Sequence, residues 1–162
     1  MMFYITGMKN KAKPQNQAQK TRKYSAGWMI NMLAAALDAS LVKQLGKLDL
    51  NINQFAILMT LLENEGLTQA EIGRKIFMRG FSTTRTLDIL EKKKLVKRLR
   101  DEQSRRCNRI YLTVRGRKIG PKLFKAVEIV NSNLLSILSK TEENQFKNLL
   151  LRLMIENCYT QE

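Results

Sequence analysis

Apolar residues recur at intervals of three or four over most of the chain, a periodicity typical of amphipathic helices. The first such segment lies between residues 24 and 47, where the apolar positions keep a 3-4-4-4 spacing: Ile30, Leu33, Leu37, Leu41 and Leu45. A helix of about six turns with these residues on its inner face is therefore predicted.

A second helix is predicted directly after Asn51. Asn51 and Gln54 have the spacing of an N-terminal cap pair. The helical period then continues through three apolar residues, Phe55, Leu58 and Leu62. The Asn-Glu-Gly segment at 64–66 is a turn signal that ends the helix.

A short capped helix follows that turn. Thr68 and Glu71 stand three residues apart, the spacing of a capping box, and Ile72 and Ile76 give the helix one apolar edge. Gly73 is small enough to let another helix cross closely.

The next helix is predicted from about residue 81 to 93, after a break at residues 78–80. Three residues share its inner face: Thr83, Leu87 and Leu90. Ser82 and Arg85 fall on the opposite face. Two short helices, the second with small polar groups and an arginine at its start, are what a reader of the DNA major groove needs.

A basic hairpin comes after this pair. Residues 95–100 and 108–112 are rich in β-forming side chains and predict two strands, joined by a polar turn that begins at 101–104. With Arg105 and Arg106 near its tip, the hairpin is predicted to be a wing.

Two helices complete the chain. Thr113 is predicted to cap a long helix that runs to about residue 139, and Thr141 to cap a last one. Pro121 lies in the early turns of the long helix, where an interior proline costs about 3 kcal/mol. Either the helix is kinked near 117–121, or its regular part begins at Pro121.

Three stretches in this order resemble the MarR/SlyA family of winged helix-turn-helix transcription regulators. They are LTQAEIGRKI, TTRTLDILEKKKLVKR, and a D-x-x-x-R-R run that continues five residues later as LT-x-x-GR, from Asp101 to Arg117. The resemblance implies a mostly α fold with a small β-wing, in which a winged helix-turn-helix is joined to terminal dimerisation helices.

The domain boundaries follow from the periodicity and the resemblance together. Residues 1–23 are expected to be a flexible basic tail, which either adds phosphate contacts or is a solvated extension. Residues 24–50 are expected to form an N-terminal dimerisation helix, 51–113 the DNA-binding domain, and 114–162 the C-terminal dimerisation helices.

The sequence departs from the family at two positions. Lys94 stands where the family commonly has glycine, at the end of the recognition helix. A left-handed cap there would cost on the order of 1 kcal/mol, which leaves open a different closure of this helix. Ser104 replaces a common aspartate in the wing turn.

The residues expected to contact DNA are Arg79, Phe81, Ser82, Thr84, Arg85, Arg105 and Arg106. Arg85 is the first choice for the major groove, where an arginine reads guanine bidentately or clamps a phosphate. Ser82 and Thr84 are either phosphate or base donors or residues that suit a helix start. Phe81 contacts a thymine methyl or packs the helix entry.

The wing arginines have a different expected role. The resemblance places the minor-groove arginine at Arg106, the second of the pair, and a narrow A·T-rich groove attracts such a side chain. Cys107 follows it; nearby cations favour a reactive thiol, but a structural or incidental cysteine is the preferred interpretation.

The charge distribution supports a polyanionic partner. Residues 68–118 carry 16 Lys/Arg against five Asp/Glu, a net charge of +11 out of the chain's +15, whereas 119–162 are neutral. Charge that served solubility alone would be spread evenly along the chain. Basic residues clustered in one segment are instead expected of a protein that binds double-stranded DNA.

Several function classes are disfavoured by composition. The chain has two cysteines and no histidine, which excludes a disulfide framework, a histidine-bearing metal site and histidine-dependent nucleophilic catalysis. No cofactor or enzymatic activity is expected. No signal peptide or membrane span is recognised, so the cytoplasm of a prokaryote, at the nucleoid, is the expected location.

Two interpretations of function remain. The first is a homodimeric, sequence-specific DNA-binding regulator acting on a pseudo-palindromic operator and modulated by a small-molecule effector. The second is an architectural nucleoid-type protein that binds DNA mainly through charge and deformability, and the ratio of operator to competitor affinity separates the two.

Overall fold

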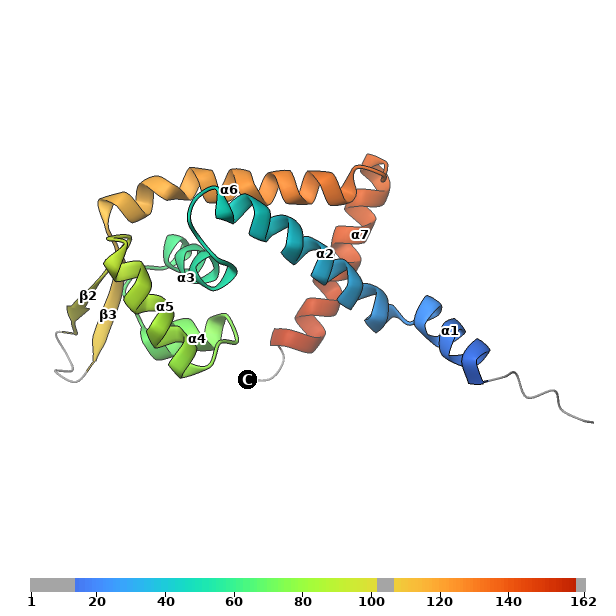
Figure 1. Cartoon of the computed structure of the whole chain (residues 1–162), viewed down its shortest axis with the longest axis horizontal. Helices are drawn as coiled ribbons and strands as arrows, with labels where there is room; N and C mark the ends of the chain where they lie inside the picture. The colour runs from blue at the N-terminus through green and yellow to red at the C-terminus, as the bar shows by residue number, and fades with distance from the viewer. Residues whose placement is uncertain (1–13, 102–106, 160–162) are drawn as a thin grey trace, which may run out of the picture. The chain divides into compact units, whose positions relative to one another are not determined.

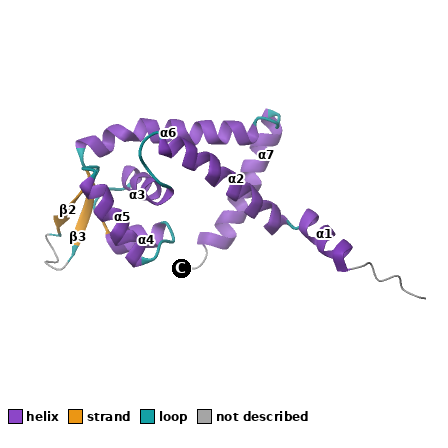
Figure 2. Ribbon diagram, viewed as in Figure 1, coloured by secondary structure: helices purple, strands orange, loops and turns teal. Residues whose placement is uncertain are grey.

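The computed structural model describes residues 14–101 and 107–159. The chain divides into residues 1–38 and residues 39–162, and each part is described by itself. The helices are α1 (Pro14–Tyr24), α2 (Ala26–Gly46), α3 (Ile52–Glu63), α4 (Gln69–Lys75), α5 (Gly80–Lys92), α6 (Val114–Leu135) and α7 (Lys140–Met154), followed by a π-helical turn, η1 (Ile155–Tyr159). The strands are β1 (Leu67–Thr68), β2 (Val96–Arg100) and β3 (Asn108–Leu112). The predicted mostly α fold with a small β-wing is confirmed (Figures 1 and 2).

The predicted caps of α3 and α4 are both present. The Asn51 side chain accepts from the Gln54 N–H at 2.9 Å, and the Gln54 side chain accepts from the Asn51 N–H at 3.3 Å. Thr68 and Glu71 form the same reciprocal box at the start of α4. Hydrogen bonds from the Thr68 backbone N–H and hydroxyl hold the pKa of Glu71 below its ordinary value.

The three strands form one antiparallel sheet in the order β1-β3-β2. The predicted hairpin is present, and it pairs Val96 with Leu112 and Arg100 with Asn108. The third strand, β1, was not predicted: Leu67 pairs with Ile110. A strand of two residues is too short to show an alternating pattern. Its partner strand lies 43 positions further along the chain, so no local hairpin signal marks it either.

The core lies between α3, α5, α6 and the sheet. The fully buried apolar residues include Leu45, Ile57, Leu58, Leu61, Ile72, Leu87, Leu90, Ile110, Leu112 and Leu123. The predicted inward face of the recognition helix is confirmed, since Thr83, Leu87 and Leu90 are inaccessible to solvent. Thr83 keeps its hydroxyl satisfied by donating to the Arg79 carbonyl at 3.1 Å.

The end of α5 closes in the left-handed way despite its lysine. Lys94 has φ +58°, its N–H donates to the Glu91 carbonyl at 2.8 Å, and the Leu95 N–H donates to the Leu90 carbonyl at 2.9 Å. These are the two bonds of a Schellman motif. The alternative, that this helix ends in another way, is therefore wrong. Both hydrogen bonds form, and Lys94 adopts the strained positive φ that they require.

Residues 14–24 form α1, where a flexible tail was expected over residues 1–23. This part of the expectation is corrected, because a proline at the first helical position and a run of Gln, Ala, Lys and Arg favour a helix without apolar periodicity. Residues 1–13 lie outside the described residues.

The predictions for the last two helices need adjustment. The cap of α7 is Ser139 and not Thr141, because Ser139 has Glu142 as a reciprocal partner three residues on. The long helix α6 begins at Val114 and contains Pro121, so a regular start at Pro121 is wrong. Proline lacks only one N–H donor, and a helix anchored by the Thr113 cap accommodates that loss in its early turns.

Only part of the predicted inner face of α2 is buried within the chain. Leu45 is inaccessible, but Ile30 is 48% and Leu33 is 40% exposed. Among the described residues, no single helix has the length and apolar composition to cross a membrane, although α1 and α2 meet that test when taken together as a bent pair.

We predict that Gly116→Ala destabilises the fold. A Cβ at residue 116 would lie 2.0 Å from the Leu95 carbonyl oxygen, a backbone atom that cannot turn away. The free energy of unfolding should fall by about 1–3 kcal/mol, measured by urea denaturation. Gly46→Ala is the control, since nothing lies within 4 Å of its Cβ position; an equal effect of both changes would contradict the packing argument.

We predict that Lys94→Gly stabilises the fold. Glycine adopts the positive φ of residue 94 without steric strain, so the free energy of unfolding should rise by about 1 kcal/mol. Lys92→Gly, inside α5, should lower it by about 1 kcal/mol in the same assay. A loss of stability in Lys94→Gly would show that the left-handed cap is not strained.

Candidate nucleic-acid interface

The helix-turn-helix is built from α4, a short turn and α5. Gly73 lets the helices approach, since a Cβ there would lie 3.1 Å from both the Met78 carbonyl oxygen and the Thr83 hydroxyl oxygen. The Met78 N–H donates to the Gly73 carbonyl at 2.8 Å, and Phe77 has φ +52°. The turn therefore fixes where α5 begins.

The start of α5 differs from the starts of α3, α4, α6 and α7. Each of those four helices has a side-chain cap, whereas the N-cap of α5, Arg79, makes no side-chain cap hydrogen bond and its first turn holds no acid. Free N–H groups at a helix start attract phosphate oxygens. The uncapped end of α5 is thus suited to an anionic partner.

Three predicted contact residues are exposed here: Arg79, Phe81 and Arg85. Phe81 is 80% exposed, so the alternative that it packs the helix entry is wrong. No described residue forms an ion pair with Arg79 or Arg85, which leaves both guanidinium groups available for an external acceptor.

The two small polar residues of the recognition helix are half-buried. Thr84 donates to the Gly80 carbonyl at 3.0 Å and accepts a hydrogen bond from the Gln69 side chain on α4. Ser82 lies one turn before Thr86, whose hydroxyl donates to the Ser82 carbonyl at 2.7 Å. Thr84 therefore also joins α4 to α5, whichever of its two expected roles applies.

Arg98 fastens the wing to the recognition helix. Its guanidinium lies 2.6 Å from an Asp88 carboxylate oxygen and also pairs with Glu91, and its backbone N–H donates to Glu91 at 3.2 Å. A planar guanidinium that bridges two carboxylates of one helix restrains both partners. Strand β2 is thereby oriented by α5.

Arg109 braces the other strand of the wing. Its Nε donates to Asp101 at 2.8 Å and its Nη1 to the Gly66 carbonyl at 2.8 Å. This hydrogen bond to the Asp101 carboxylate raises the pKa of Arg109 above its ordinary value. Arg105, Arg106 and Ser104 lie outside the described residues, but the strands leading to them are fixed by these contacts.

Glu65 joins the sheet to α6. Its carboxylate accepts two hydrogen bonds from Arg117, at 2.8 Å each, and one from the Leu112 N–H at 3.1 Å. The acid therefore has a structural role here. Among the described residues, no group of three His, Cys, Asp or Glu side chains could hold a metal ion.

Sequence reasoning overlooked residues in the turn between the two helices. Phe77 is 81% exposed, and Arg74 is exposed beside it; both line a shallow recess with Gln69 and Arg79. The available signal was a large apolar residue next to basic ones in a segment too short to bury it. Cys107 is an exposed free thiol immediately before β3.

The comparisons with known proteins agree with this geometry. The family model described as MarR family matches residues 50–108. The HTH-type transcriptional regulator YybA of Bacillus subtilis is 28% identical over 123 residues, which cover 76% of this chain and 82% of YybA. The regulator SarZ of Staphylococcus haemolyticus is 34% identical over 79 residues, or 49% of this chain, and the match spans about half (54%) of SarZ.

Solved structures share the fold. A MarR transcriptional regulator from Methanosarcina mazei superimposes with a TM-score of 0.74 at 27% identity, covering 81% of this chain and 94% of that one. A MarR family protein from Mycobacterium tuberculosis, crystallised with salicylic acid, gives 0.67 at 26%, covering 79% and 95%. A MarR variant from E. coli, crystallised with operator DNA, gives 0.73 at 24%, covering 83% and 96%, which shows the fold alone.

Proposed function

The chain belongs to the MarR family of DNA-binding transcription regulators, and from this we propose that it acts as a homodimer on a pseudo-palindromic operator, in the cytoplasm of a prokaryote, and responds to a small ligand. The observation that carries the proposal is the uncapped, basic start of α5 between a braced wing and the α4 turn. One such surface per subunit would enter one major groove, and two would lie about one helical turn of DNA apart.

The assignment of roles follows from exposure. Arg79 and the free N–H groups of α5 are proposed to clamp phosphates, and Arg85 to contact a base edge in the major groove. Phe81, with most of its ring in solvent, is proposed to contact a thymine methyl. Arg105 and Arg106 are proposed to enter the minor groove from the wing.

The homodimer is supported by apolar surface that the chain leaves uncovered. No residue of α7 is buried. Its apolar residues Leu149 and Leu153, for example, are 56% and 53% exposed. A 15-residue helix with no buried residue gains little stability from packing and is marginal in water. Exposed apolar patches of this kind mark interfaces, and a second copy of the chain is the partner we propose.

Ligand modulation is supported more indirectly. The Mycobacterium tuberculosis neighbour is described in complex with salicylic acid, and its fold matches most of this chain. The architectural alternative is disfavoured by the distinct presentation of Arg85 on α5, because binding by charge and deformability alone needs no such base-reading side chain.

We predict that Arg85→Ala and Arg106→Ala impair DNA binding in different ways. Loss of Arg85 should weaken operator binding and relax the preference at one base pair of each half-site, by about 1–3 kcal/mol. Loss of Arg106 should weaken binding most on A·T-rich flanks and leave the half-site preference unchanged. Binding-site selection with both variants and the unmodified chain measures this.

Lys125→Ala is the charge-matched control, because Lys125 is exposed on α6 and pairs with Glu128 at 2.9 Å. It should leave both the affinity and the preference nearly unchanged. A uniform loss of affinity over all sequences in both arginine variants would contradict base reading and support the architectural alternative.

We predict a dimer that depends on the apolar face of α7. Sedimentation at micromolar concentration should give about twice the chain mass of 18.8 kDa. Leu149→Glu combined with Leu153→Glu should shift it toward the monomer, whereas Asn144→Glu with Asn148→Glu, at exposed polar positions of the same helix, should not. A monomer at all concentrations would contradict the proposal.

A further inference from the structure

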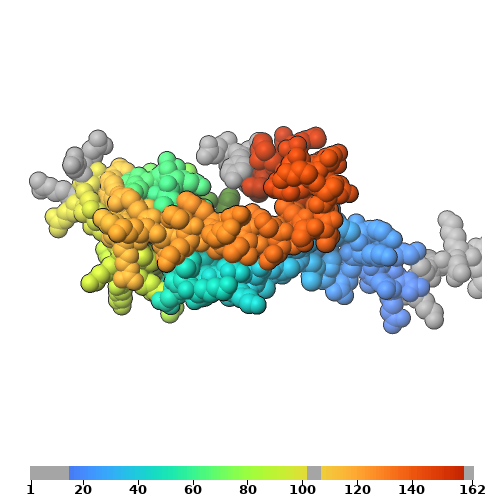
Figure 3. Space-filling view, turned by 90° about the horizontal axis from the view of Figure 1, so that it is seen from above, coloured from blue at the N-terminus to red at the C-terminus, as the bar shows by residue number. Residues whose placement is uncertain are grey.

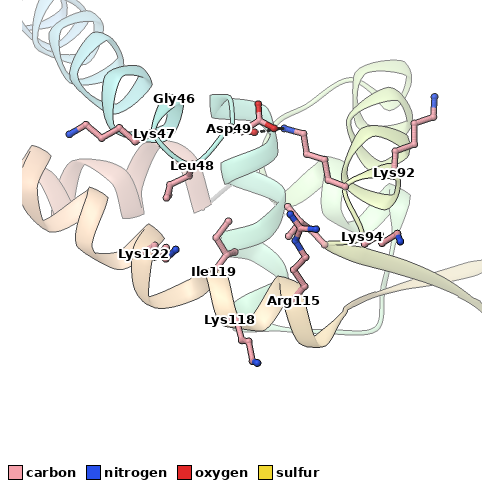
Figure 4. Close-up of a pocket in the computed structure, with 12 residues that line it drawn as sticks. Gly46, Lys47, Leu48, Asp49, Lys92, Lys94, Arg115, Lys118, Ile119 and Lys122 are labelled. Carbon is pink, nitrogen blue, oxygen red and sulfur yellow. Dashed lines mark hydrogen bonds and ion pairs between the residues drawn. The ribbon is translucent and has the colours of Figure 1, made fainter.

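A recess in the part of the chain formed by residues 39–162 gathers positive charge at the end of α5 opposite to its DNA-facing start (Figure 4). The recess has a volume of about 670 Å³ and lies where the end of α2, the end of α5 and the first turns of α6 meet. Its lining includes Lys92, Lys93 and Lys94 at the end of α5, and Arg115, Lys118 and Lys122 on α6. We refer to it as the basic recess.

The acidic side chain that lines the basic recess is already paired with a lysine. Asp49, the one acid among the lining residues, forms an ion pair with Lys93 at 2.9 Å. Within the described part of the chain, the side chains of the other basic residues of α5 and α6 that line it form no ion pair or hydrogen bond. Several like charges therefore remain uncompensated around one hollow.

The lysines of α5 have an ordinary explanation, but the cations of α6 do not. Cations at a helix end, such as Lys92, interact favourably with the negative end of the helix dipole. Arg115 lies in the first turn of α6, where the dipole favours acids, and that turn holds none; Lys118 and Lys122 follow on the next turns, beyond the reach of the dipole. Their spacing of three and four residues places them on one face, where like charges repel.

The view in Figure 4 shows how these side chains are disposed. Arg115 points from α6 toward the end of α5, whereas Lys92 and Lys118 extend away from one another at the rim. Mutual repulsion favours this arrangement, and the long rotatable stems of lysine allow the ammonium groups to turn inward. In the view of Figure 3, α6 lies uncovered over much of its length, with the end of α2 beside it.

We propose that the basic recess binds a compact anion that carries two or more phosphate groups. Lysine is a common point-charge ligand for phosphate, and a multiply charged anion offsets several cations at once. The volume falls within the range of small-ligand sites, about 300–1,000 Å³. The recess lies at the opposite end of α5 from the start proposed to read DNA, a helix length of about 20 Å away.

The position of the recess gives such a ligand an effect on the reading helix. The Thr113 hydroxyl, at the start of α6, donates to the Lys94 carbonyl at 2.6 Å, so the two walls of the recess already meet. A phosphate anion held by Lys94 and Arg115 would tighten this junction and fix the orientation of α5. An effect of the ligand on operator affinity rests on the proposed function. Binding of the anion in the recess does not depend on it.

The experiment titrates the full chain with sodium tripolyphosphate in calorimetry, in the presence of EDTA and without DNA. The pocket variant combines Lys94→Gln, Lys118→Gln and Lys122→Gln, all at exposed positions. The control variant has the same charge and combines Lys43→Gln, Lys125→Gln and Lys140→Gln, which lie outside the lining. Thermal melts verify that both variants fold, and single Lys118→Gln serves if the triple pocket variant does not.

We expect saturable binding with one site per chain, weakened roughly tenfold or more in the pocket variant and by less than about twofold in the control. Arg85→Ala should bind tripolyphosphate as the unmodified chain does. Pyrophosphate and ATP titrations identify the source of the phosphates: tighter binding of ATP assigns a nucleotide, and equal binding assigns the phosphate chain alone.

Equal weakening in both triple variants would show diffuse attraction and overturn the proposal. So would a pocket variant that loses operator binding as Arg85→Ala does while the unmodified chain takes up no tripolyphosphate, because the recess would then be a surface for the DNA backbone. Saturable tripolyphosphate binding by a chain that shows no operator preference would overturn the proposed function and leave this inference standing.

Discussion

The close approach of α6 to the end of α5 constrains the rest of the DNA-binding part. The Leu95 carbonyl accepts from the Thr113 N–H at 3.0 Å and leaves no room for a side chain at Gly116. Because Lys94 turns the chain in a left-handed conformation just before it, the recognition helix, the first wing strand and α6 are fixed at one point. The end of the helix that carries Arg85 is held by this junction.

The two ends of α5 are built in opposite ways. Its start is uncapped and exposed, which leaves N–H groups and arginines free for phosphates, whereas its end is closed by two backbone hydrogen bonds and by the core residues Leu87 and Leu90. Arg98, paired with Asp88 and Glu91, connects the wing to the middle of the same helix. A single rigid helix can thus carry both the reading surface and the proposed ligand effect.

Much of this arrangement could be predicted from the sequence because its signals are local. The capping pairs at Asn51 and Thr68 and the inner face with Leu87 depend on residues three or four positions apart, and these were confirmed. The strand β1 could not be predicted, since it pairs with β3, far along the chain. The basic recess was missed for the same reason: the sequence shows Lys94 only as the end of a helix, and only folding brings α6 against it.

The lack of buried residues in α7 has a consequence for how the chain exists at different abundances. A helix that buries none of its residues within its own chain, and is covered by another subunit, is folded more completely the more often that subunit is present. In the proposed homodimer, the ordered fraction of each chain becomes a function of its own concentration. Expression level would then set how complete each molecule is, as well as how many molecules compete for DNA.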